Sequence, residues 1–439
     1  MAQIGGKWAT SLVLGALSAL LAAGCAAPGG GGSSAQDTSQ PLKVGFIAGL
    51  TGTAAAPAAD MKNGFELYWE NSGGKVAGRK VETFIENDEG KPEVGLSVAR
   101  RLVEQQKVDV VVGPHFANVG TAVAQYLATT DTPMIYPIPA SSEFLKKPIP
   151  SMFLAGGTAS QFTQPLGKWA AEKGYKKAAT ISSDYSFGHE IAGGFTNTFT
   201  DYGGTVGDQI WVPLGTTDYG PFVSKIAAGN YDVVFDGLQA QDAVVFQQAW
   251  GDFGLAKKGP ALLASPSTVD QSLLRSMKES AVGTYSTGHF AEGRSEGETA
   301  KFVAAYEKKY GKIPGYYAAS GYFGAQITAA ALEKLNGKIP NSAAFITTAK
   351  KLNLADSVFG PIKMDAHGNI NMNVYIRKVE PRAAGGFWNV VESTIPNVAP
   401  EFEYKYESFL AEQPYTRDNQ GQDWPKSCAD YTVQPCPVK

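Results

Sequence analysis

The stretch from Val108 to Ser142 constrains the fold of this chain more than any other part of the sequence. A run of β-branched residues at 108–112 and a second short apolar run at 133–137 flank a segment whose apolar side chains recur at helical spacing. Short, almost wholly apolar strands are typical of a parallel sheet that is buried on both faces. The stretch therefore predicts a strand, a helix capped by Asn118, and a second strand parallel to the first.

This unit also predicts where a ligand binds. In open parallel sheets small ligands bind beyond the carboxyl ends of the strands. Those ends lead here into the loops at 115–118 and 138–142. We therefore expect these two loops to contribute to a binding site.

Alternation of strand and helix runs through most of the chain. One series spans about 42–137, and a second with the same rhythm restarts near Ser160, with strands at 178–182, 206–212, 231–235 and 261–264. A chain of 439 residues is too long for one ordinary core. The pattern predicts an α/β protein of two lobes, each built on a doubly wound parallel sheet.

The rhythm changes after Gly283. Long helices are predicted at 298–310 and 317–335, the second rich in Ala and Gly and therefore tightly packed, and closing strands at 358–364 and 373–379. Aromatic and charged residues alternate at 402–406, which is typical of a half-buried strand.

The first residues indicate export. After Lys7 an apolar segment, 12–23, is too short to span a bilayer and ends in Ala22-Ala23-Gly24-Cys25. This arrangement resembles a bacterial lipoprotein signal, which implies that residues 1–24 are removed and that Cys25 is lipidated; an ordinary secretory signal with an incidental cysteine is the alternative. Residues 25–40 are rich in Gly and Ser and predict a flexible tether. We expect an extracytoplasmic, lipid-anchored protein.

Two further cysteines, Cys428 and Cys436, lie close together near the carboxyl terminus. In an oxidising compartment such a pair predicts a disulfide, although two free thiols are the alternative. Too few metal-binding side chains lie near them for a metal site. The overall balance of 38 basic and 41 acidic residues, without a long basic run, argues against nucleic acid as a partner.

Several motifs together resemble one protein family. They are Lys43-Val44-Gly45-Phe46-Ile47 with Thr51-Gly52, Asn87-Asp88, Val112-Gly113-Pro114, Pro133-Met134-Ile135, and the segment 359–368, Phe-Gly-Pro-Ile-Lys-Met-Asp-Ala-His-Gly. In this order they resemble the extracytoplasmic solute-binding proteins of ATP-driven (ABC) importers, in the branched-chain amino acid (Leu/Ile/Val) and amide binding family.

The resemblance implies a type I flytrap, in which two lobes joined by three chain crossings enclose a ligand. Lobe 1 would comprise residues 41–157 and 288–370, lobe 2 residues 158–287 and 371–400, and the remaining 401–439 a tail. It also implies a monomer that needs no cofactor and has an ABC permease in the membrane as its partner.

The resemblance places the ligand-holding residues on the loop tips. Family members that bind amino acids use hydroxyl residues of the first lobe, whose positions fall here on Ala117 or Asn118 and on Ala140, with Ser141 and Ser142 as substitutes if the register differs by one. The second-lobe positions fall near Phe187, on Asp236 to Gln239, and on Ser265 where an acidic residue is expected. The pattern that fixes an amino acid is therefore weakened.

The other loop-tip side chains are mostly rings. They are His115, Phe116, Tyr185, Phe187, His289 and Phe290. Such a pocket favours a flat or apolar small molecule, and we expect an aromatic or other organic acid whose carboxylate accepts a hydrogen bond from His115 or His289. Alternatively, the histidines are structural, Phe116 and Phe187 belong to the lobe cores, and Asp236 caps a helix. A branched-chain or other hydrophobic amino acid is the alternative ligand.

Two other classes of function compete with transport. A catalytic function is disfavoured because the chain has only four histidines. It also has no Gly-x-Ser-x-Gly elbow and no Walker-type phosphate loop. A sensory module that presents its ligand to a membrane receptor would have the same sequence features as a transport protein.

Overall fold

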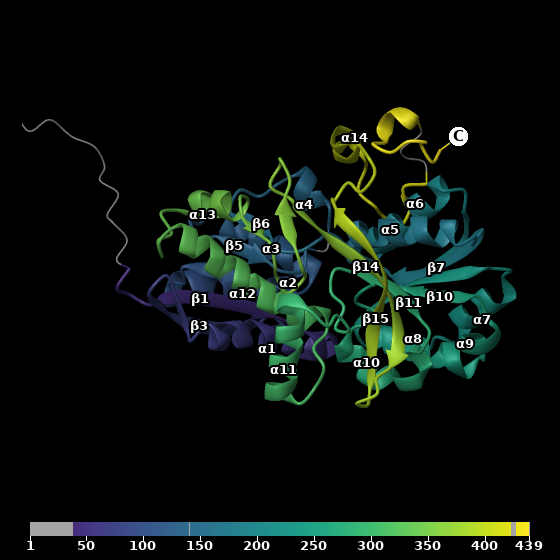
Figure 1. Ribbon diagram of the computed structural model, residues 1–439, viewed down its shortest axis with the longest axis horizontal. Helices are drawn as coiled ribbons and strands as arrows, with labels where there is room; N and C mark the ends of the chain where they lie inside the picture. Colours follow the sequence, from purple (N-terminus) through teal and green to yellow (C-terminus); the bar gives the residue numbers. More distant parts are fainter. Residues whose placement is uncertain (1–37, 140, 423–426, 439) are drawn as a thin grey trace, which may run out of the picture. The chain divides into compact units, whose positions relative to one another are not determined.

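The computed structural model describes residues 38–139, 141–422 and 427–438, and it contains two parallel-sheet lobes (Figure 1). The first sheet has the order β2-β3-β1-β4-β5-β6, in which only β2 is antiparallel to its neighbour. Its strands are β1 (Leu42–Ala48), β2 (Lys75–Val76), β3 (Arg79–Asn87), β4 (Val110–Val112), β5 (Met134–Tyr136) and β6 (Met152–Leu154).

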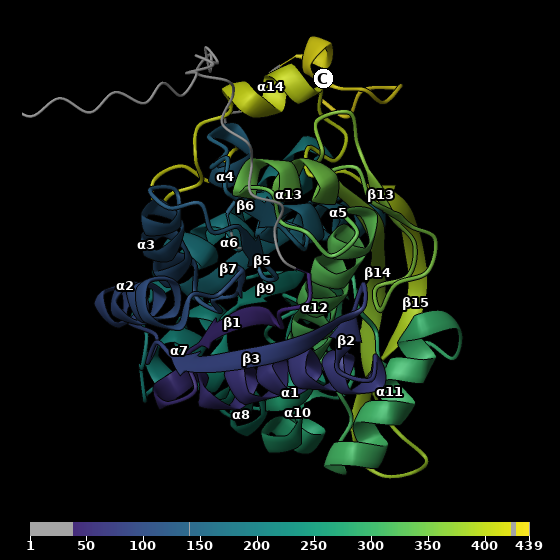
Figure 2. The same ribbon diagram turned by 90° about the vertical axis from the view of Figure 1, so that its left-hand side faces the viewer.

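Helices cover both faces of this sheet. The long helices α1 (Ala55–Asn71) and α12 (Tyr316–Lys334) pack on one face, together with α13 (Ser342–Ala349) and α11 (Gly297–Tyr310). The other face is covered by α2 (Pro92–Arg100) and α3 (Ala117–Leu127), which Figure 2 shows on the opposite side of the sheet from α12. Side chains of β1 alternate between the two cores, Phe46 on the α1 side and Ile47 on the α2 side.

The second sheet repeats this design. Its parallel strands, in the order β11-β10-β9-β7-β8, are β7 (Lys177–Ser183), β8 (Thr205–Val212), β9 (Val233–Gly237), β10 (Ala261–Ala264) and β11 (Tyr285–Gly288). One face is covered by α5 (Ala159–Glu172) and α6 (Ser186–Asp201), and the other by α7 (Gly220–Ala228), α8 (Ala240–Asp252) and α10 (Gln271–Met277), with the short α9 (Leu255–Lys258) beside α8. The predicted fold of two doubly wound lobes is confirmed.

A long hairpin of β14 (Ile370–Pro381) and β15 (Phe387–Val398) packs against the cores of both lobes. Met372, Val374 and Val398 lie in the first-lobe core, whereas Val379 belongs to the second-lobe core. The start of β14 also pairs with β13 (Ile362–Met364), which in turn pairs with β12 (Asn353–Leu354). β14 thus begins at the lobe boundary expected at 370/371. Its first residues still pack in the first-lobe core, and the strand enters the second-lobe core several residues later.

Two local predictions are wrong. The residue that precedes α3 is Phe116, and Asn118 lies inside the first turn, where its Oδ1 accepts a hydrogen bond from the Val119 amide. The segment 402–406 is not a strand: Tyr404 forms a single antiparallel bridge with Tyr431, and Tyr406 begins α14 (Tyr406–Ala411). Of the three rings in this segment, Tyr404 is buried, whereas Phe402 and Tyr406 are partly buried.

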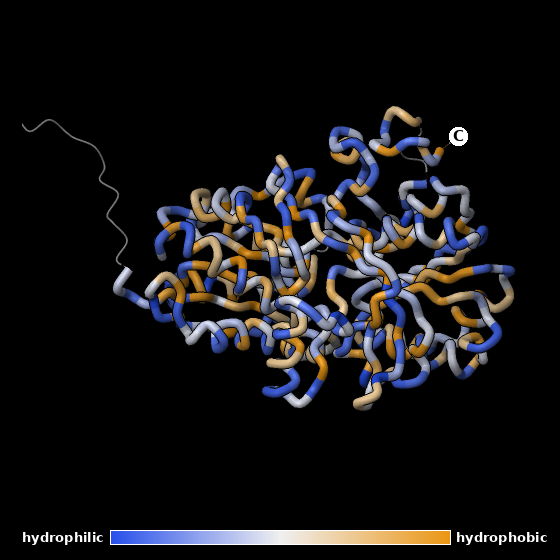
Figure 3. Tube along the Cα trace, viewed as in Figure 1, coloured by the Kyte–Doolittle hydropathy of each residue, from blue (hydrophilic) through white to orange (hydrophobic). Residues whose placement is uncertain are grey.

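A disulfide joins Cys428 to Cys436 within the tail. Residues 1–24, the tether up to residue 37 and Cys25 lie outside the described residues. Figure 3 shows hydrophobic stretches along the strands of both sheets, while the outer helices alternate between hydrophilic and hydrophobic segments.

Candidate ligand-binding cleft

A small cavity lies between the two lobes. The loops that follow the carboxyl ends of the strands, with the starts of helices, form its wall. The lining residues are His115, Phe116, Ala117, Ile138, Pro139, Tyr316 and Tyr317 from the first lobe and Ala159, Phe162, Tyr185, Phe187, Gln239, Pro266 and Ser267 from the second.

His115 follows β4 and is held among rings. Its ring lies 4.8 Å from that of Phe116 and 4.8 Å from that of Tyr317, measured between centroids. The side chain is buried, and its Nδ1 has no hydrogen-bond partner among the described residues. Burial lowers the pKa of His115 to about 4, so the ring is neutral at pH 7 and offers one N–H donor.

Gln239 supplies a second polar group to the cavity. It precedes α8, and its buried Nε2 also lacks a partner within the described part of the chain. A buried donor without a partner costs free energy unless a ligand or water satisfies it. A polar group of a ligand would therefore supply the missing hydrogen-bond partner of His115 or Gln239.

Aromatic rings make up much of the remaining wall. Tyr185 and Phe187, at the start of α6, have ring centroids 6.1 Å apart, and Tyr316 lies beside Tyr317 at 5.0 Å. Burial raises the pKa of the Tyr185 and Tyr317 hydroxyls well above the ordinary value, so both are neutral. Phe187 also belongs to the core of the second lobe, and Phe116 packs against the α2–α3 core. These two phenylalanines therefore line the cavity and also pack against the lobe cores.

Asp236 and Ser265 do not line the cavity. Asp236 is fully buried at the end of β9, where its carboxyl oxygens accept hydrogen bonds from the Leu238 amide at 3.0 Å and from Gln247 at 3.4 Å. Burial raises the pKa of this carboxyl to about 8. The Ser265 hydroxyl bonds with those of Ser267 and Thr268 at 2.9 and 2.8 Å. Both side chains thus shape the loops beneath the cleft.

His289 lies behind the wall. Its ring stacks on Phe162 at 4.4 Å and meets Phe359 edge-on at 4.1 Å. It is fully buried, neither ring nitrogen has a partner among the described residues, and burial lowers its pKa well below the ordinary value. The imidazole is thus neutral core packing, separated from the cavity by Phe162.

The remaining predicted residues lie elsewhere. Asn118 lines a second, more open cavity with Glu89, Tyr185 and Leu214. Ser141 accepts a hydrogen bond from the Glu143 amide, and Ala140 lies outside the described residues. Phe290 is buried in the first-lobe core.

Sequence reasoning missed several residues of the cleft. Tyr316 and Tyr317 open the Ala- and Gly-rich helix α12, and adjacent tyrosines at a helix start were the available signal. Arg377 is a single arginine within an apolar stretch of β14. It is buried behind the wall and donates hydrogen bonds to Ser286 Oγ and to the Phe290 carbonyl oxygen, the latter at 2.6 Å. Glu292 and Asp270 lie near enough to act electrostatically on its positive charge.

Polar contacts hold the two lobes together around the cavity. Asp60 on α1 pairs with Arg275 on α10 at 2.9 Å, and Tyr306 and Lys312 also bond to its carboxylate. Asp270, which caps α10, lies against Gly315 and the Tyr317 amide. The lobes are therefore in contact through α10 and the residue that caps it.

Two parallel-sheet lobes that close on a ring-lined cavity define the class of two-lobed solute-binding proteins. The chain belongs to the periplasmic binding protein family, whose sequence profile matches residues 41–386. It thereby stands among the solute-binding proteins of ABC transporters, as the motifs predicted. No helix in the described part of the chain is long and apolar enough to cross a membrane.

Similar proteins come from several bacteria. A solute-binding protein of an ABC transporter from Rhodopseudomonas palustris BisB5, solved with 3,4-dihydroxybenzoic acid, is 30% identical with a TM-score of 0.78, covering 82% of this chain and 98% of that one. Another from R. palustris, solved with 4-hydroxybenzoate, is 28% identical with a TM-score of 0.77, covering 82% and 98%. The Leu/Ile/Val-binding protein homolog 6 of Brucella suis is 28% identical over 79% of this chain and 90% of its own.

Proposed function

We propose that this protein captures an aromatic carboxylic acid of the benzoate type in the interlobe cleft and delivers it to the permease of an ABC importer. The observation that carries the proposal is a ring-lined cavity in which two buried side-chain nitrogens, His115 Nδ1 and Gln239 Nε2, have no partner in the described structure. Gln239 Nε2 is a donor, and His115 Nδ1 is one in the tautomer that carries its proton there. A planar ring would stack within the walls, and its carboxylate would accept hydrogen bonds from these donors.

The composition of the lining fits an anionic ligand better than a cationic one. None of the described lining residues is Asp or Glu, and the charge of Arg377, which lies behind the wall close to Gly288 and so to Pro266, is balanced by nearby Glu292 and Asp270. An α-amino acid brings an ammonium group, which needs acceptors and is best held by a carboxylate. The nearest predicted candidate, Asp236, is buried beneath the loop.

The relatives support the same ligand class. Two of the similar structures hold 3,4-dihydroxybenzoic acid and 4-hydroxybenzoate. The Brucella relative is named for leucine, isoleucine and valine, so a branched-chain amino acid is the second candidate. The missing carboxylate in the cavity lining argues against it.

We also propose that the chain is anchored outside the cytoplasmic membrane through a lipid on Cys25, because its first 25 residues resemble a lipoprotein signal. Membership of the periplasmic family fits this location. A Cys25→Ser variant should move from the membrane fraction to the soluble fraction of the producing bacterium. Retention of the variant on the membrane would contradict lipid anchoring.

A thermal-shift and calorimetry screen tests the ligand. Benzoate, 4-hydroxybenzoate, benzamide, leucine and isoleucine are compared, because a ligand that binds only the folded protein stabilises it by about 2.7 kcal/mol at a hundred times its Kd. We expect shifts with the two acids and a weaker one with benzamide, which has the ring without the charge. Stabilisation by leucine without any by the acids would overturn the proposal.

A further inference from the structure

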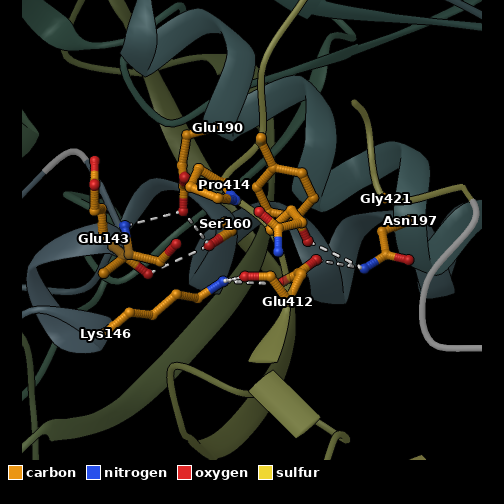
Figure 4. Close-up of polar contacts among 12 residues, drawn as sticks. Glu143, Lys146, Ser160, Glu190, Asn197, Glu412, Pro414 and Gly421 are labelled. Carbon is orange, nitrogen blue, oxygen red and sulfur yellow. Dashed lines mark hydrogen bonds and ion pairs between the residues drawn. The ribbon is translucent and has the colours of Figure 1, made fainter. Parts of the chain in front are cut away.

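The C-terminal tail connects the two lobes beside the cleft. It follows β15 and lies beyond residue 386, where the family match ends. Figure 4 shows Glu412 of the tail between Lys146 of the first lobe and Asn197 of the second. The described part of the tail that makes these contacts is residues 401–422, which we call the strap.

The strap is anchored on helices α5 and α6 of the second lobe. Glu403 accepts hydrogen bonds from Lys168 at 2.6 Å and from the Tyr202 hydroxyl, and Tyr404 donates to Asp201 at 2.6 Å. Tyr415 packs directly on α6 at Gly193, where a Cβ atom would lie 2.3 Å from its ring. The ring therefore requires a glycine beneath it.

The strap also holds the first lobe. Lys146 at the end of α4 (Glu143–Lys146) donates to the Glu412 carbonyl oxygen at 2.8 Å and pairs with its carboxylate at 3.3 Å. Both side chains are almost fully buried, at 7% and 2% exposure. The same ammonium lies 4.9 Å from the Phe409 ring, and Tyr406 stacks on His367 of the first lobe at 3.6 Å.

A second carboxylate joins the lobes next to this pair. Glu190 on α6 accepts hydrogen bonds from the Ser142 amide of the first lobe at 3.1 Å and from the Ser160 hydroxyl of α5 at 2.7 Å. Glu412 in turn accepts from Asn197 on α6 at 3.4 Å. Removing one partner of a buried ion pair is costly, because the other charge then lacks an opposite charge beside it.

We propose that the strap holds the lobes in the closed arrangement and thereby sets how often the ligand-free cleft opens. A swing of the lobes about the β14–β15 hairpin moves α4 away from α6, and a strap fixed to both must lose one set of contacts. The closed form is the one that surrounds a ligand, so its population in the free protein scales the apparent affinity.

Distances between two spin labels, measured by electron paramagnetic resonance, test the proposed role of the strap without any ligand. Labels are placed on Lys91→Cys and Leu214→Cys in a Cys25→Ser background, because Gly90 of the first lobe and Leu214 of the second line the same cavity. In Lys146→Met, at pH 8, we expect the ratio of open to closed molecules to rise about tenfold, in the range of typical couplings between protein states. Lys147→Met is the matched control, since Lys147 is exposed and pairs only with exposed Glu143 among described residues.

A second variant keeps the test valid if Lys146→Met folds poorly. Glu412→Gln preserves the shape and the bond from Asn197 while removing the charge, and we expect the same direction of change with a smaller size. If both variants fold and their distance distributions are identical to that of the parent, the proposal that the strap holds the lobes closed is wrong. Because no ligand is added, this result is independent of whether aromatic acids bind.

Discussion

The ring of His115, from the loop after β4, meets the ring of Tyr317, from the start of α12, edge to face, with centroids 4.8 Å apart and planes at 89°. This contact fixes the imidazole within the first lobe before any ligand arrives. The ring is therefore preorganised, and binding need not order it. Because its Nδ1 has no partner among the described residues, a substitution of His115 is the most specific test of the site.

Replacing His115 by Phe should weaken binding without loss of stability. The substitution keeps an aromatic ring and removes a donor to a carboxylate, a hydrogen bond of the kind that contributes about 1.5–3 kcal/mol. We expect at least a tenfold rise in the Kd for 4-hydroxybenzoate by calorimetry and an unchanged or higher Tm. His289→Phe is the control, because His289 is equally buried but lies behind Phe162. Equal losses in both variants would contradict a ligand role for His115.

Phe187→Ala should lower both affinity and stability. Sequence reasoning alone predicts a loss of affinity with an almost unchanged Tm, but Phe187 is 92% buried, with 8% exposure, and belongs to the second-lobe core. Truncation of a core phenylalanine costs about 3–5 kcal/mol. Urea unfolding measures the stability loss, and Phe187→Leu, which keeps more of the volume, should recover most of it. An unchanged unfolding midpoint in the alanine variant would contradict the core assignment.

Asp236 should make the protein less stable as the pH rises. Its pKa is about 8 in the folded protein against 3.8 for the ordinary group, so between these values the folded state binds more protons than the unfolded state. The free energy of unfolding then falls with rising pH, by up to about 1.4 kcal/mol per pH unit. In Asp236→Asn this contribution disappears, and the unfolding free energy should change less between pH 5 and pH 8.

The asparagine variant is a fair control because Gln247, whose Oε1 has no partner among described residues, can rotate its amide and accept from the new Nδ2. Other buried carboxyls, such as Asp270 with a pKa raised to about 6, are present in both proteins and cancel in the comparison. Parallel pH profiles for the two proteins would show that Asp236 does not hold its proton.

Gly321→Ala should destabilise the first lobe. A Cβ atom at Gly321 of α12 would lie 1.9 Å from the Met61 carbonyl oxygen of α1, and overpacking of this kind costs about 1–3 kcal/mol or more. Gly251→Ala on α8 is the matched control, because its added Cβ meets only Ser280 at 3.8 Å, and alanine is the better helix former. We expect a lower Tm for the first variant and an equal or higher Tm for the second.

The parallel core of the fold could be predicted because its signals are local. The apolar runs at 42–48 and 108–112 are buried on both faces, and the Ala- and Gly-rich helix after Gly315 packs as closely as predicted, through Gly64 and Gly321. The hairpin that connects the lobes was harder to place. Whether residue 374 or 379 lies in a given lobe depends on contacts with distant strands, which the local pattern does not encode.

The cleft was predicted in part for the same reason. His115, Phe116, Ala117, Tyr185, Phe187 and Gln239 all line the cavity, since loops after parallel strands converge at one sheet edge. His289, Asp236 and Ser265 lie one layer below, because the depth of a loop side chain depends on its neighbours. Asp236 accepts its own loop's amide, as a short carboxylate after a strand commonly does.

The β14–β15 hairpin contributes side chains to the cores of both lobes. Because one ladder completes both cores, we expect the two halves to unfold together in denaturant. A truncated single lobe would expose a severed sheet edge, and such edges pair with other chains. The element that joins the lobes thus also completes the core of each.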